Sequence, residues 1–157
     1  MFSKKKKSTD DYRREKFGAV GYQDRCILYP LDEDGQWRLS IDEIAVVGEF
    51  NCDNGLTIPN YSYVFVTWEP CWWYELPYDA IGRDRVLDSL SLEFGFEVKN
   101  DLMFSTELES KIVWPLQMFG EPLFQFVENT PWWRKYWLPR VQVLLTPAVL
   151  EYVQRGR

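Results

Sequence analysis

The stretch from Asn60 to Tyr78, NYSYVFVTWEPCWWYELPY, constrains the fold most, because it concentrates large apolar and β-favouring side chains in one short run. Alternate side chains of an extended strand point to opposite faces, which places Tyr61, Tyr63 and Phe65 on one face and Val64, Val66 and Trp68 on the other. Both faces are apolar, so we expect a strand in the middle of a sheet. The break at residues 69–71 predicts a tight hairpin whose two arms are both central strands.

The length and composition suit a single globular domain. A chain of 157 residues can bury a core of its own, and eight tryptophans are more than one small core can hide, so some are expected at the surface. Residues 1–16, MFSKKKKSTDDYRREK, are mostly charged and contribute little apolar surface. We therefore predict a flexible tail over residues 1–16 and one domain over residues 17–157.

The charge balance indicates what kinds of partner the chain can hold. The formal net charge is −6, and without the Lys4–Lys7 run 14 basic residues face 24 acidic ones, a net charge of −10. A nucleic-acid partner is not expected, because binding phosphates requires a basic face. No membrane insertion and no secretory signal are expected either, since no long apolar run occurs, and the predicted location is the cytoplasm.

The residues that usually carry catalysis are scarce. The chain has no histidine, which removes histidine-based triads and most zinc sites. Cys26, Cys52 and Cys71 match no zinc or redox spacing, and no phosphate-binding glycine loop or nucleophile motif is present. We expect no enzyme, no cofactor and no metal site.

The first two thirds of the chain read as a meander followed by a helix. Strand patterns and the Asp34-Gly35 turn signal predict about five consecutive strands over residues 25–77. Over residues 79–95 the period becomes helical, with Gly95 as the expected end of the helix. In this helix Val86, Leu87, Leu90 and Phe94 are predicted to face the sheet, and Arg83, Asp84, Asp88 and Glu93 to face solvent.

The last third adds strands and short helices. A last strand is predicted at Val141–Leu145 and a short helix at residues 130–138, while residues 96–98 are a candidate short strand and residues 122–129 are either another strand or an edge. Residues 105–115 are ambiguous, because charged and apolar residues alternate there before Pro115 stops the segment. Thr146 and Pro147 should begin a final helix that packs through Val149, Leu150 and Val153. The predicted class is α+β: a mainly antiparallel sheet with one amphipathic helix packed on it and a short C-terminal helix.

Two segments, IDEIAVVGEF on an early strand and WWYELPYDAIGRDRVLDSLSLEFG leading into the helix, give a family resemblance. Over about residues 25–95 the chain resembles small bacterial domains of the pleckstrin-homology-like superfold, including those of GRAM type. The resemblance implies a binding scaffold more often than a catalyst. The chain departs from a minimal domain by the residues that it adds after the helix, and its first loop, LDEDGQ, lacks the basic residues of the phosphoinositide-binding version.

Two aromatic clusters are candidate sites. The first combines tryptophans with cations, the residue types that dominate protein-binding hot spots: Trp132, Trp133, Arg134, Lys135, Tyr136 and Trp137. The alternative for this cluster is that it caps an exposed edge of the core. The second places carboxylates beside rings, as carbohydrate-binding and glycoside-hydrolysing proteins do: Trp68, Glu69, Trp72, Trp73 and Glu75.

The sequence therefore predicts a non-catalytic module that binds another protein. An acidic single domain with an aromatic patch suits an inhibitor or immunity protein that blocks a basic toxin or nuclease through charge complementarity. The competing hypotheses are a carbohydrate-binding or glycoside-hydrolysing protein that uses residues 68–75, and a structural adaptor.

Overall fold

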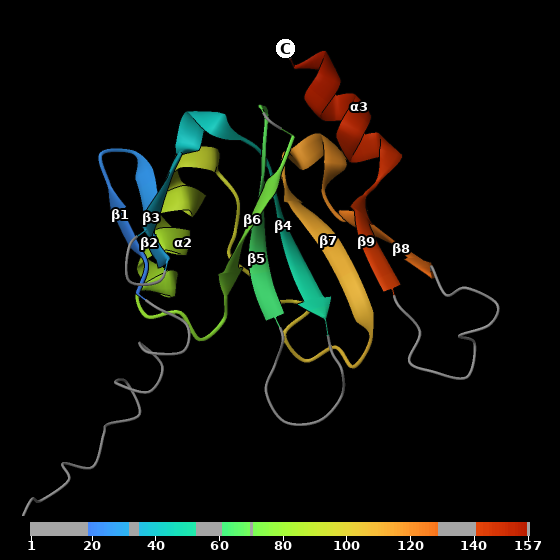
Figure 1. Cartoon of the computed structure of the whole chain (residues 1–157), viewed down its shortest axis with the longest axis horizontal. Helices are drawn as coiled ribbons and strands as arrows, with labels where there is room; N and C mark the ends of the chain where they lie inside the picture. Colours follow the sequence, from blue (N-terminus) through green and yellow to red (C-terminus); the bar gives the residue numbers. More distant parts are fainter. Residues whose placement is uncertain (1–18, 32–34, 53–60, 70, 129–140, 157) are drawn as a thin grey trace, which may run out of the picture.

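The computed structural model describes residues 19–31, 35–52, 61–69, 71–128 and 141–156. These residues form three antiparallel sheets and two α-helices (Figure 1), which confirms the predicted α+β class. The strands are β1 Gly21–Gln23, β2 Cys26–Leu31, β3 Gly35–Ser40, β4 Ile44–Cys52, β5 Tyr61–Thr67, β6 Trp73–Pro77, β7 Leu108–Trp114, β8 Phe124–Glu128 and β9 Val141–Leu145. The helices are α2 Arg83–Phe94 and α3 Pro147–Arg155, with the short 3-10 turns η1 Ile41–Glu43 and η2 Leu116–Met118.

The central sheet has the strand order β6-β5-β4-β7. Every residue of β5 is buried, and its alternate side chains enter two separate cores, as the sequence predicts. The hairpin between β5 and β6 is confirmed, with Val66 opposite Trp73. The prediction that both arms are central is wrong for β6, which pairs only with β5 among the described strands. The exposed Glu75 in β6 fits an edge position.

The two faces of the central sheet carry different layers. One face packs against α2 and the small sheet β1-β2-β3, and the other packs against the β8–β9 ribbon and α3 (Figure 1). The ribbon is fastened to the edge of β7, since the Phe124 amide donates to Ser110 Oγ at 2.8 Å. The described residues thus form two hydrophobic cores, one on each face of the central sheet.

The predicted five-strand meander is divided between two sheets. β3 pairs with β2, whereas β4 pairs with β5 and β7, so β3 and β4 are not neighbours. Between them Ser40 begins η1 with a capping box, in which the Asp42 amide donates to Ser40 Oγ and the Ser40 amide donates to Glu43 Oε2. This turn redirects the chain into the central sheet.

Helix α2 begins and ends at glycines in the left-handed conformation, with φ of 88° at Gly82 and 70° at Gly95. The expected end at Gly95 is confirmed, as is the burial of Val86, Leu87 and Leu90. The prediction that Arg83 faces solvent is wrong, because its side chain is only 4% exposed. Arg83 stands on the same helical face as the buried apolar residues.

The C-terminal third follows the prediction with two corrections. Residues 96–98 form no strand, because no described strand pairs with them, although Phe96 is buried in the first core and Val98 packs against it. Thr146 caps α3 as expected, and Val149 and Val153 are buried, but Leu150, which was expected to pack with them, is 39% exposed. The predicted helix at 130–138 and the predicted tail at 1–16 lie outside the described residues.

Candidate binding surface on the tryptophan hairpin

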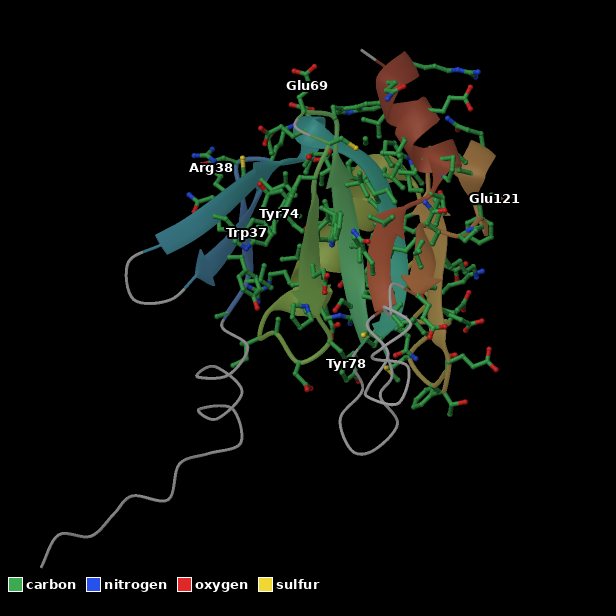
Figure 2. The ribbon with its side chains drawn as sticks, turned by 45° about the vertical axis from the view of Figure 1, so that its right-hand side comes forward. Trp37, Arg38, Glu69, Tyr74, Tyr78 and Glu121 are labelled. Atoms are coloured by element: carbon green, nitrogen blue, oxygen red, sulfur yellow. The ribbon has the colours of Figure 1, made fainter. Side chains whose placement is uncertain are left out.

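The second candidate cluster lies on β5, β6 and their turn, here called the tryptophan hairpin (residues 61–77). The turn is held by the Thr67 amide, which donates to the Trp72 carbonyl at 2.9 Å, and by the Trp72 amide, which donates to Thr67 Oγ1 at 3.4 Å. Figure 2 shows Glu69 at this end of the molecule, with Tyr78 toward the opposite end of the sheet. The turn therefore gathers the aromatic residues at one end of the central sheet.

Two of the three indoles pack on the C-terminal part of the chain. The Trp73 ring lies edge-on to Phe124 of β8, with ring centroids 5.3 Å apart. The Trp68 ring lies 5.6 Å from Tyr152 of α3 and is so close to the chain end that a Cβ on Gly156 would meet it at 2.1 Å. Both indoles are half-buried, and both help to cover the second core.

Trp72 has a different environment. Its side chain is 58% exposed, and its ring lies almost parallel to that of Trp73, with centroids 5.6 Å apart and an interplanar angle of 16°. One indole is thus presented to solvent on top of another that is anchored in the core. Such a support limits the conformational freedom that Trp72 would lose on binding.

Carboxylates accompany this stack. Trp73 Nε1 donates to Glu75 Oε1 at 3.3 Å, and the Glu75 and Glu69 side chains are exposed. The structure therefore brings Trp72, Trp73 and Glu75 together on one surface with Glu69 at the adjoining turn, while Trp68 is directed toward α3. We call Glu69, Trp72, Trp73 and Glu75 the acidic tryptophan surface.

The other candidate cluster, Trp132, Trp133, Arg134, Lys135, Tyr136 and Trp137, lies outside the described residues. Its assignment to a partner-binding site or to a core edge stays a prediction.

Sequence reasoning missed a buried carboxylate. Glu49 on β4 is 1% exposed, accepts from the Leu102 amide at 3.0 Å and accepts from the Tyr63 hydroxyl at 3.5 Å. Burial raises the pKa of Glu49, the nearby Asp101 carboxylate adds to this, and the Leu102 amide and Lys111 oppose it. The sequence signal was an acid inside the otherwise apolar strand IAVVGEF.

A buried cation lies in the same core. The Arg83 guanidinium carbon stands 5.6, 5.4 and 5.1 Å from the ring centroids of Tyr61, Tyr63 and Tyr78. Its Nη2 donates to Asn100 Oδ1 at 2.6 Å and its Nη1 to Asp84 Oδ1 at 2.8 Å, while Nε is buried and has no hydrogen-bond partner among the described residues. Burial also raises the pKa of Tyr61 and Tyr63, so both remain protonated. The Arg83–tyrosine cluster is an internal support of the hairpin.

A cavity of about 710 Å³ opens beside this cluster, lined by residues 19–20 and 78–85. Two acidic side chains, Asp79 and Asp84, and two basic ones, Arg83 and Arg85, belong to its lining. Because the lining is balanced, it selects no ligand charge. The Arg83 Nε, which has no hydrogen-bond partner among the described residues, has almost no accessible surface and so does not face this cavity.

Comparison with models of protein families, with curated proteins and with solved structures finds no match for this chain. The resemblance to pleckstrin-homology-like domains therefore stays a prediction. Within the described part of the chain, no helix is long and apolar enough to cross a membrane. The same residues contain no group of three potential metal-binding side chains.

Proposed function

We propose that this protein is a non-catalytic module that binds another protein through the acidic tryptophan surface. The observation that carries the proposal is the exposed Trp72 indole stacked on the half-buried Trp73. Tryptophan is enriched among hot-spot residues, because it removes a large area from water with few rotatable bonds. An exposed tryptophan held in one orientation has no evident role in the folding of the hairpin itself.

The charge of the surface specifies the partner. Glu69 and Glu75 flank the stack, and the whole chain carries a net charge of −6. A basic partner would be steered toward this surface and would pair with its carboxylates. In its narrower form the proposal is an inhibitor or immunity protein in the cytoplasm, whose partner is a basic toxin or nuclease.

The experiment compares partner capture by the wild-type protein and by two variants. Wild-type, Trp72→Ala and Leu92→Ala proteins are used to capture partners from extracts of the producing cell, and the captured protein is purified and its affinity measured with each variant. Leu92 is the control, since it is an exposed apolar residue on α2, away from the surface. The proposal predicts a partner that Leu92→Ala binds and Trp72→Ala loses, and it fails if both variants bind alike.

Carbohydrate binding is the second candidate, because an exposed indole beside a carboxylate can also stack on a sugar ring. The flanking acids Glu69 and Glu75 are both exposed at the surface. Titration of the protein with a panel of oligosaccharides, monitored by tryptophan fluorescence, distinguishes carbohydrate binding from protein binding. Saturable quenching that is lost in Trp72→Ala would favour carbohydrate binding.

A further inference from the structure

The outer edge of β6 is open in the described part of the chain, where β5 is its single neighbour. The register shows which backbone groups face outward. Trp72 and Tyr78, at the two ends of β6, are hydrogen-bonded to β5. The Thr67 amide donates to the Trp72 carbonyl, and the Tyr78 amide donates to the Tyr61 carbonyl, both at 2.9 Å. Bonded and non-bonded pairs alternate along an antiparallel ladder, so Trp73 and Glu75 direct their N–H and C=O groups away from β5.

The side chains along this edge differ between its two faces. Trp73 and Glu75 lie on the face of the second core, next to Trp72. Tyr74 lies on the opposite face, where its ring contacts that of Trp37 on β3 with centroids 4.8 Å apart, and Figure 2 shows these two rings between β3 and β6. A strand placed beside β6 would meet a carboxylate and indoles on one face and a tyrosine–tryptophan pair on the other.

We propose that an extended basic segment of the partner protein adds to β6 as a new edge strand. This inference rests on the proposed function and specifies how the partner is held. Backbone groups of Trp73 and Glu75 supply the hydrogen bonds, as in other cases of strand addition. Lysine or arginine at alternate positions pairs with Glu75 and packs on the indoles, and apolar residues between them cover Tyr74 and Trp37.

The chemistry of the edge disfavours a second copy of the same chain as the occupant. Antiparallel pairing of two β6 strands centred on Glu75 would set two carboxylates opposite each other, and like charges in that position destabilise a sheet. Pro77 has no N–H group, so pairing cannot extend past the end of β6. The edge thus suits a short, positively charged strand.

The test uses the full chain and a short synthetic peptide of alternating lysine and valine as the probe. Glu75→Pro removes the outward N–H without removing a bond to β5, and Glu75→Gln keeps the N–H but removes the charge. Peptide binding is measured by titration in amide NMR spectra. We expect shifts at Trp73 and Glu75, an affinity loss of at least about tenfold in Glu75→Pro, and a smaller, salt-dependent loss in Glu75→Gln.

A modified probe repeats the test on the unaltered protein, in case Glu75→Pro does not fold. The same peptide, methylated on the amides that would face β6, should lose affinity by at least about tenfold, because those N–H groups can no longer donate. Strand addition is overturned if the methylated peptide binds as tightly as the unmethylated one, or if Glu75→Pro binds the peptide as tightly as the wild-type protein does. It is also overturned if the lysine–valine peptide does not bind at all, or if sedimentation shows a dimer of the wild-type protein that Glu75→Pro abolishes.

The two proposals fail separately. If the purified partner is lost with Trp72→Ala but retained with Glu75→Pro, the acidic tryptophan surface binds the partner without strand addition. If Trp72→Ala retains the partner, the proposed function itself is wrong.

Discussion

The Arg83 guanidinium carbon lies 5.1 Å from the ring centroid of Tyr78, inside a cluster in which Tyr61 and Tyr63 present two further rings. Arg83 is on α2 and the two other tyrosines are on β5. The contacts of Arg83 with Tyr61 and Tyr63 therefore join α2 to β5, the strand that leads into the tryptophan turn at its other end. A cation on an aromatic face is stabilised most where water is excluded, as it is here.

Replacing Arg83 should destabilise the fold. Arg83→Ala leaves Asn100 Oδ1 without its short bond and removes the cation from three rings, so we expect a loss of about 3 kcal/mol in the free energy of unfolding. Arg85→Ala is the control, since Arg85 is exposed, and should change stability by less than about 0.5 kcal/mol. Urea denaturation measures both, and equal effects would show that the cluster contributes nothing.

Glu49 should make stability depend on pH. Its pKa is raised in the folded state, so the folded protein binds this proton more tightly than the unfolded chain, and stability falls as pH rises above the unfolded pKa of about 4.3. Glu49→Gln removes this dependence and keeps an acceptor for the Leu102 amide. The variant should be more stable than wild type near neutral pH, by a margin that shrinks toward about pH 4.

Thermal or urea unfolding over this pH range gives that margin directly. A margin that stays constant, or that grows as pH falls, would contradict the assigned cause, which is burial of the carboxylate.

Two glycines with positive φ offer a matched comparison of local crowding. At Gly82 a Cβ would lie 2.3 Å from the Val20 carbonyl oxygen, whereas at Gly95 it would meet no atom of the described residues within 4 Å. Gly95→Ala should cost about 1 kcal/mol for the left-handed backbone alone, and Gly82→Ala about 2 kcal/mol or more. Equal costs in urea denaturation would mean that the segment around Val20 shifts without penalty.

Sequence patterns predict the central strand and both described helices, because their apolar periods are clear and the helices have recognisable boundaries, Gly95 at the end of α2 and Thr146 at the start of α3. Arg83 was misplaced for a specific reason. Its position, three and four residues before Val86 and Leu87, belongs to the buried face, whereas its charge favours the exposed face, so the two signals conflict. Long side chains can bury their charge when rings and acceptors surround it, as happens here.

The sequence also contains a signal for the division of the meander into two sheets between β3 and β4. Residues 40–43, SIDE, form a capping box, which indicates a helical turn between two strands rather than a hairpin. The separation of the three tryptophans into two packed rings and one exposed ring was not readable. It depends on contacts with Phe124 and Tyr152, which lie far away in the sequence.

The most direct test of the central claim measures, for Trp72→Ala and Trp73→Ala, both the loss of binding affinity for the partner and the loss of free energy of unfolding. Trp72→Ala should cost at least about 2 kcal/mol in binding the captured partner and less than about 1 kcal/mol in unfolding, because Trp72 is 58% exposed. Trp73→Ala should cost roughly 3 kcal/mol in unfolding, since it removes the ring that packs on Phe124. A Trp72→Ala protein that binds the partner as tightly as wild type would contradict the account.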